Sequence, residues 1–204
     1  MAAITIAVAQ QALINRKKDI SDVSIPLFCQ WCDFVNKYLY RQLTNIDPER
    51  FIASSLYTVS SSPSTQALPA GFLNMSAMGC GIFRQDGNGN DTDTQLPRSS
   101  FGSSDTGFYV TGTNVVFTGI NSVTTFRLRY IPALATLTQL SDSMILDDYW
   151  LEYLVNAMDQ QYNIWDEDVM GKMVADSAFV NSMSDLLSCF RREFDVLSTF
   201  DPLQ

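Results

Sequence analysis

The order of the secondary-structure signals constrains this chain more than any single motif does. Helix-like segments come first, a long middle stretch rich in Gly, Ser, Thr and Asn alternates like β-strands, and a helical third closes the sequence. A chain of 204 residues suits one ordinary domain and buries a core without needing disulfides or metals. The predicted fold class is α+β, a helical bundle body with an inserted antiparallel β-rich excursion.

Two N-terminal helices are expected within residues 1–50. Strong helix formers over 9–14 indicate a short first helix. The second helix has Ser24 as its N-cap and Pro26 in its first turn, where a missing N–H is tolerated. An apolar stripe with helical spacing then runs over 28–43. Residues 1–50 and 140–198 together form the predicted helical body of a single domain spanning 1–204.

Residues 51–135 form the predicted β-rich insertion. Alternation indicates a strand over 73–77, and a Gly-Thr-Asn turn between apolar runs indicates a hairpin over 108–117. Over 126–130, apolar residues alternate with Arg127 and Arg129, so one face is buried and the other carries arginines. The polar segment 84–107 predicts a long mobile loop.

An αα-hairpin is expected in the C-terminal third. One apolar stripe runs over 151–165, and a second follows the acidic corner 166–168. The two stripes are predicted to bury against each other. The members of the second stripe are Met170, Met173, Val174, Ser177, Val180, Met183, Leu187, Phe190 and Phe194. Helix should stop before Pro202, which leaves an apolar C-terminal tail over 199–204.

The charge balance excludes one large class of functions. The net charge is −9, whereas binding of phosphate backbones needs clustered Lys and Arg. An anionic membrane surface would repel such a chain, but an acidic wall lets DNA slide past without adhering. Basic residues follow the mildly apolar N-terminal segment, opposite to a secretory signal, so a soluble and unprocessed chain is expected.

Two motifs suggest redox or metal chemistry, and each has an ordinary structural interpretation. Cys29 and Cys32 have redox-motif spacing, but both lie on the helical stripe and no βαβ pattern surrounds them. Asp86, Asn88 and Asn90 resemble the start of a calcium loop, yet the bidentate Glu of its twelfth position is missing. We therefore interpret the two cysteines as buried thiols and the segment from Asp86 as an ordinary turn. No cofactor and no metal are predicted, with the calcium-like loop kept as a weak candidate.

Catalysis is poorly supported by the sequence. The chain contains no His, and no nucleophile-elbow signature occurs. Asp147, Asp148 and Glu152 could supply paired carboxylates for glycoside hydrolysis, although carboxylates one turn apart usually form a solvated helix face. The protein is predicted not to be an enzyme.

Several segments in order resemble a known family, the head-to-tail adaptor (connector) proteins of tailed bacteriophages. These segments are Leu13-Ile14-Asn15-Arg16, Val23-Ser24-Ile25-Pro26-Leu27-Phe28, Val35-Asn36-Lys37-Tyr38-Leu39-Tyr40-Arg41, Ala67-Leu68-Pro69-Ala70-Gly71-Phe72-Leu73, Phe108-Tyr109-Val110-Thr111-Gly112, Phe126-Arg127-Leu128-Arg129-Tyr130-Ile131-Pro132 and Leu146-Asp147-Asp148-Tyr149-Trp150-Leu151-Glu152-Tyr153-Leu154-Val155.

The resemblance implies a virion structural protein of the phage neck, made in the bacterial host cytoplasm. It implies a homo-oligomeric ring, a dodecamer, beneath the portal protein. Such a ring extends the DNA channel and offers a docking platform for tail proteins (nozzle, tube or fibres). The genome would pass through without specific binding, and no membrane is involved. Another tail component (tail-tube, tail-completion or fibre-docking protein) is the alternative, and a cell-wall hydrolase is a further one.

Two sets of contact residues are expected from this interpretation. The C-terminal end is assigned to the portal contact, with Phe194, Leu197, Phe200 and Leu203. The contact between subunits or with tail proteins is assigned to Arg127, Arg129 and Arg84.

Overall fold

The computed structural model describes residues 3–17, 22–147, 150–166 and 169–199, without the side chains of 93, 147, 169, 172 and 192–199. The chain forms two compact units. The helical unit comprises Met1–Asp47 and Ala135–Gln204, and the β unit comprises Pro48–Leu134. The α+β class predicted from the sequence is confirmed, with antiparallel sheets inserted between the N-terminal helices and the C-terminal helix pair.

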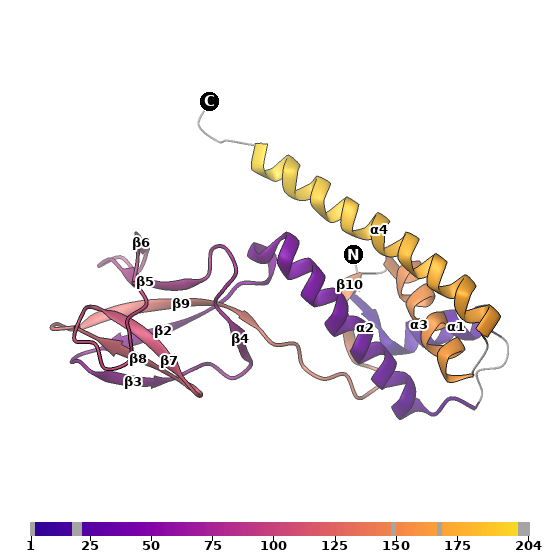
Figure 1. Ribbon diagram of the computed structural model, residues 1–204, viewed down its shortest axis with the longest axis horizontal. Coiled ribbons are helices and arrows are strands. Elements are labelled where there is room, and N and C mark those ends of the chain that lie inside the picture. The colour runs from indigo at the N-terminus through magenta and orange to yellow at the C-terminus, as the bar shows by residue number, and fades with distance from the viewer. Residues whose placement is uncertain (1–2, 18–21, 148–149, 167–168, 200–204) are drawn as a thin grey trace. The chain divides into compact units, whose positions relative to one another are not determined.

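The helical unit contains four helices and one small sheet among its described residues (Figure 1). Its elements are β1 (Ala3–Thr5), α1 (Ile6–Arg16), α2 (Ile25–Ile46), β10 (Ser143–Asp147), α3 (Leu151–Trp165) and α4 (Val169–Thr199). Strand β1 pairs antiparallel with β10. The sequence predicted neither strand, because three to five residues are too few for a clear alternation. Within the described segments, no helix is long and apolar enough to cross a membrane.

Helix α2 is the central element of this unit. Ser24 caps it as predicted, its Oγ accepting a hydrogen bond from the Leu27 N–H at 3.4 Å, and Pro26 lies in the first turn. The predicted apolar stripe is buried from Phe28 to Leu43 except at Tyr38, which is exposed, and Gln30 is exposed off the stripe. Burial of this stripe against α3 and α4 holds the helix in place, since the intrinsic propensity of one helix is weak.

The αα-hairpin of α3 and α4 is also confirmed, but one part of its predicted packing is wrong. The buried apolar residues described on α4 are Ala175, Met183 and Leu186, and the Tyr153 hydroxyl of α3 lies 3.6 Å from Met183 Sδ. The first half of the predicted stripe, including Met170 and Met173, is exposed instead. Helix α4 carries apolar residues on more than one side, and α3 can cover only one of them.

The β unit is built from two antiparallel sheets. Its elements are the 3₁₀ helix η1 (Pro48–Phe51), β2 (Ala53–Val59), β3 (Ser64–Ala67), β4 (Phe72–Asn74), β5 (Gly81–Gln85), β6 (Asp91–Gln95), β7 (Gly107–Thr111), β8 (Asn114–Thr118) and β9 (Thr124–Pro132). One sheet has the order β2-β9-β5-β6, with β4 also paired to β9, and the other has the order β3-β8-β7.

Aromatic side chains join the two sheets. The Phe117 ring on β8 stacks on Phe126 of β9 at a centroid distance of 5.1 Å and meets the edge of Tyr57 on β2 at 5.8 Å. Both phenylalanines are fully buried. Aromatic pairs of this kind contribute about 0.5–1.5 kcal/mol beyond their buried area. The face of β9 that the sequence predicted to be buried therefore forms part of the core of this unit.

The segment 84–107 differs from the long loop that the sequence predicted. It contains β6, which pairs with β5, and residues 97–99 lie beside β7. Strand β6 reads Asp-Thr-Asp-Thr-Gln and has no apolar alternation, so its sequence carries no strand signal. Main-chain pairing to β5 decides its conformation.

Candidate interaction surfaces

The most exposed apolar surface of the helical unit lies on the first half of α4. Met170, Met173 and Val174 have 73%, 65% and 71% of their surfaces exposed. They share one side of the helix because they are spaced by three and four residues. A shallow groove of about 560 Å³ follows this side, lined by Met170, Met173, Val174, Ser177, Ala178 and Asn181. We call these six residues the α4 stripe.

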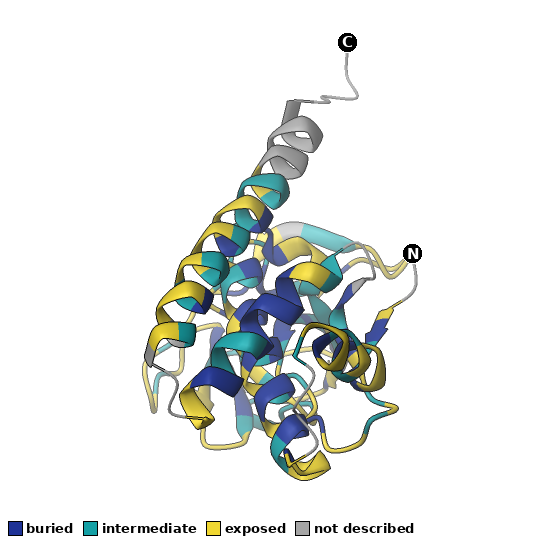
Figure 2. Ribbon diagram, turned by 90° about the vertical axis from the view of Figure 1, so that its right-hand side faces the viewer, coloured by how far each residue is buried: buried dark blue, intermediate teal, exposed yellow. Residues whose placement is uncertain are grey.

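The α4 stripe has the properties of a protein contact. Its apolar residues are contiguous, whereas single exposed apolar residues are scattered over most protein surfaces. Figure 2 shows exposed residues recurring along α4, the helix that leads to the C-terminus, whereas residues 153–158 of α3 are buried. The opposite side of α4 is fixed by hydrogen bonds, from Asn156 to Ser182 at 2.5 Å and from Gln160 to Asp176 at 2.6 Å. The stripe is therefore held rigidly outward within its own unit.

The residues assigned to the portal contact lie at the other end of α4. Phe194 and Leu197 belong to its last turns, and their side chains are outside the described residues. Phe200 and Leu203 also lie outside the described residues. Their role stays a prediction.

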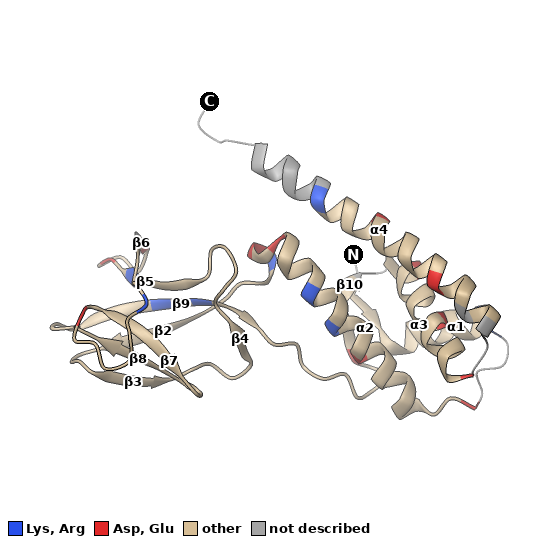
Figure 3. Ribbon diagram, in the orientation of Figure 1, with Lys and Arg blue, Asp and Glu red and all other residues tan. Residues whose placement is uncertain are grey.

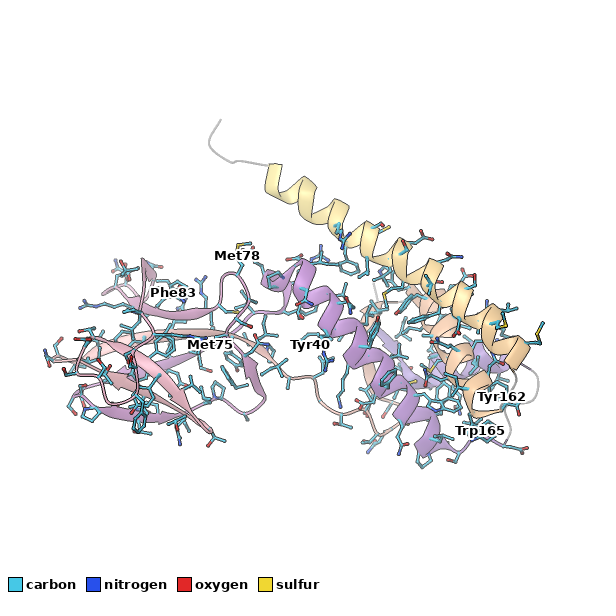
Figure 4. All side chains as sticks on the ribbon, viewed as in Figure 1. Tyr40, Met75, Met78, Phe83, Tyr162 and Trp165 are labelled. Atoms are coloured by element: carbon cyan, nitrogen blue, oxygen red, sulfur yellow. The ribbon has the colours of Figure 1, made fainter. Side chains whose placement is uncertain are left out.

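The three arginines assigned to subunit or tail contacts separate into a pair and a single residue. Arg127 and Arg129 lie on one face of β9, and the Asp91 carboxylate on β6 forms ion pairs with both, at 3.4 Å from Arg127 Nη1. The Arg129 guanidinium also lies 5.0 Å from the centroid of the Phe83 ring, a residue labelled on β5 in Figure 4. This pair is tied to its own sheet, so a partner would meet a partly neutralised surface.

Arg84 lies apart from that pair. It is registered opposite Phe126, on the other side of β5 from Phe83, and its side chain is exposed. Figure 3 marks these basic positions on β5 and β9. Arg84 lines a cavity of about 830 Å³ together with Thr92 and Thr124. The arginines predicted as one contact therefore occupy two surfaces of the β unit.

The calcium-like sequence forms the turn between β5 and β6. The Asp86 carboxylate accepts hydrogen bonds from the main-chain N–H groups of Asn88 and Asn90, each at 2.8 Å. These bonds, led by that from Asn90, lower the pKa of Asp86 below its ordinary value. The carboxylate stabilises its own turn in this way. In the described part of the chain, no three His, Cys, Asp or Glu residues are grouped so as to hold a metal ion.

The Cys29 and Cys32 thiols are reduced and buried in α2. Burial raises the pKa of both, most strongly at Cys32, whose Sγ lies 3.6 Å from Met158 Sδ. A redox dithiol needs a lowered pKa, so this environment suits the structural interpretation. Of the carboxylates considered for hydrolysis, Glu152 is exposed in the first turn of α3, and the Asp147 side chain and Asp148 lie outside the described residues.

An aromatic cluster was missed by the sequence reading. Trp165 at the end of α3, 42% exposed, has its ring centroid 6.4 Å from Trp31 and 5.9 Å from Tyr162. Figure 4 labels Tyr162 and Trp165 near this end of α3. Lys17 lies over the Tyr162 ring at 5.6 Å and forms an ion pair with Asp159 at 3.1 Å. The contacts join the first and last thirds of the sequence, so no local pattern could have predicted them.

The comparison with known families covers both units. The sequence matches the family described as SU10 adaptor protein over residues 1–199. Among curated proteins, none matches the chain. The match agrees with the resemblance drawn from the ordered segments of the sequence, and it gives the protein the structural role of a phage adaptor, with a location in the virion. The chain belongs to the SU10 adaptor protein family, a family of phage head–tail adaptors.

Proposed function

We propose that this adaptor forms a homo-oligomeric ring, a dodecamer, under the portal protein, where it extends the DNA channel and provides the docking platform for tail proteins. The family match over residues 1–199 is the observation that carries the proposal. The net charge of −9 supports it, because DNA can pass an acidic wall without adhering. The protein acts through its surfaces and is not an enzyme.

The ring needs a contact between unlike faces of neighbouring subunits. A ring contact is heterologous, so one face of a subunit must fit a different face of the next. The α4 stripe supplies one apolar face. A second candidate face lies on α2, where Phe34 is 60% exposed. We assign the ring contact to these two faces, and the portal contact to Phe194, Leu197, Phe200 and Leu203.

The β unit is assigned to the docking of tail proteins such as nozzle, tube or fibres. Arg127, Arg129 and Arg84 are its proposed contact residues. Arg127 and Arg129 are already paired with Asp91. Their contact with an acidic partner therefore contributes to the specificity of docking more than to the binding affinity. Arg84, beside its cavity, is the more accessible of the three.

Electron microscopy of the adaptor mixed with its portal tests the proposal. A ring of adaptor density beneath the portal is expected for the wild-type chain. Deletion of residues 196–204 should abolish portal binding while the subunit stays folded. Portal complexes that still co-sediment with the truncated chain would reject the assigned portal contact.

Substitution of the stripe tests the ring contact separately. Met173→Lys places a charge in the α4 stripe but removes no buried contact, so thermal stability should be unchanged. Ring formation on the portal should be lost. Gln11→Lys, at an exposed position of α1 outside both assigned faces, serves as the control and should assemble normally. Normal rings from Met173→Lys would exclude the stripe from the contact.

A further inference from the structure

The four outer strands of the β unit are not equally protected. Strands β2 and β6 are the edges of one sheet, and β3 and β7 are the edges of the other. An unpaired edge is a template for another strand, and proteins usually protect it with charges, short strands, irregular register or a covering segment. Comparison of these four edges shows which of them is open to a partner.

Three of the edges are protected. On β7, the Phe108 N–H donates to the Pro97 carbonyl at 3.0 Å and the Phe108 carbonyl accepts from Ser99 N at 2.8 Å. Strand β6 is acidic, and its register with β5 shifts. Strand β3 has four residues, and its Ala67 carbonyl already accepts a hydrogen bond from the Tyr57 hydroxyl at 2.9 Å.

Strand β2 has none of these protections. It runs for seven residues, Ala-Ser-Ser-Leu-Tyr-Thr-Val, with no charged residue and no proline. Its register with β9 is continuous from Ala53 to Val59. Within the described residues, no strand, loop or side chain pairs with its outer edge. This edge is long, regular and uncharged.

The pairing of β5 with β9 determines which main-chain N–H and C=O groups of β2 point to its outer edge. The Ile82 carbonyl accepts from Leu96 N at 2.7 Å, so the main-chain groups of Ile82 point away from β9. Its partner Leu128 therefore directs its own groups to the other side, toward Ser55 of β2. Because this direction alternates along a strand, Ser54, Leu56 and Thr58 direct their N–H and C=O groups to the free edge.

These three residues are self-complementary about Leu56. If two copies of β2 pair antiparallel about a two-fold axis, Leu56 faces the same residue of the second copy, and Ser54 faces Thr58. Each such pair can exchange two main-chain hydrogen bonds. The side chains of all three are exposed, Leu56 by 61%, so the pairing also covers an apolar residue and sets hydroxyl beside hydroxyl.

Electrostatics do not oppose this contact. Strand β2 carries no charge, and the two arginines registered opposite it on β9, Arg127 and Arg129, are both paired with Asp91 of their own subunit. We propose that β2 of one subunit pairs with β2 of a second copy of this chain about a two-fold axis at Leu56. An isologous contact closes on itself and is separate from the head-to-tail contact of a ring. It can therefore form between subunits that are not neighbours in a ring.

One pair of strands is a small interface, so the contact is a weak one. Sedimentation equilibrium of the full-length chain from micromolar to millimolar concentration tests it, in the Met173→Lys background to remove association through α4. The mean mass should rise from that of one chain toward that of two. A mass of one chain throughout would overturn the proposal.

Proline substitutions test whether the outer edge of β2 forms the contact between the two copies. Leu56→Pro removes only an outward N–H, which an edge strand tolerates, and it should abolish self-association without unfolding the chain. Leu56→Thr keeps the N–H and should still associate. Ser55→Pro removes a donor that faces β9 and should unfold the β unit. If a folded Leu56→Pro chain associates as strongly as the parent, the contact lies elsewhere and the proposal is wrong.

Hydrogen exchange distinguishes a second copy from another occupant. The Leu56 and Thr58 amides should exchange more slowly as the concentration of the chain rises, while the Tyr57 amide, bonded to β9, is slow at all concentrations. Protection of Leu56 and Thr58 that appears in tailed particles alone would assign the edge to a strand of a different protein, against the proposal.

Discussion

The Asn36 side chain of α2 accepts a hydrogen bond from the main-chain N–H of Ile145 on β10, with 2.9 Å between Oδ1 and N. Asn36 is 2% exposed, and the two residues lie on opposite sides of the β unit in the sequence. One turn earlier, Asp33 Oδ1 accepts from Leu137 N at 3.0 Å. Helix α2 therefore anchors the chain where it returns into the helical unit.

Asn36→Leu should destabilise the helical unit by about 1–3 kcal/mol, because the part-buried N–H of Ile145 loses its partner. Urea unfolding monitored by circular dichroism measures the change. Gln30→Leu is the matched control on the exposed side of α2 and should stay within about 0.5 kcal/mol of the parent. Equal stability of the two variants would contradict the anchoring role.

Gly119 should tolerate no side chain. Its φ is +65°, and an added Cβ would overlap the main chain at Asp105 and Thr106. Gly119→Ala should therefore destabilise the β unit by more than the strain of a left-handed residue alone, about 1–2 kcal/mol. Gly112→Ala isolates that strain, since its φ is +56° and no atom lies within 4 Å of the added Cβ. Thermal unfolding that ranks the two variants equally would disprove the overlap.

Asp142 should make stability depend on pH in the acid range. Its carboxylate accepts from the N–H groups of Thr138 and Gln139 at 2.8 and 3.0 Å, which lowers its pKa below the ordinary value of 3.8. The stability that the Asp142 carboxylate gives to the folded chain is fully present above pH 3.8, and it is lost as the pH falls through the lowered folded-state pKa.

The measurement is the urea midpoint of the parent chain and of Asp142→Asn against pH. The parent should be the more stable chain at neutral pH, and the difference should shrink below the ordinary pKa, since a protonated Asp resembles Asn. A difference that is constant with pH would show that the carboxylate charge contributes nothing.

The four thiols should differ in reactivity. Cys29, Cys32 and Cys80 are buried, and burial raises the pKa of each, so little thiolate is present at neutral pH. Cys189 on α4 is only half-buried. A disulfide reagent such as Ellman's reagent should modify Cys189 first, and Cys189→Ser should remove the fast phase. Rapid modification of more than one thiol in the native chain would contradict this burial.

Sequence patterns determined the elements whose signals are local. The Ser24 cap, the stripe of α2 and the alternation of β9 each follow from a periodicity that one buried face imposes. The turn before β8 follows from residues with strong local preferences. These features, taken in order, were sufficient for the α+β class, and the ordered sequence segments carried the adaptor resemblance.

Tertiary structure decided the features that depend on distant partners. The polar strand β6 exists because β5 pairs with it, and Asp91 on β6 then holds Arg127 and Arg129 from the far end of the insertion. The exposure of the α4 stripe was equally beyond the sequence. An apolar periodicity indicates that one face of a helix avoids water, but it does not indicate which neighbour covers that face. Only the tertiary structure therefore shows that Met170 and Met173 stay exposed.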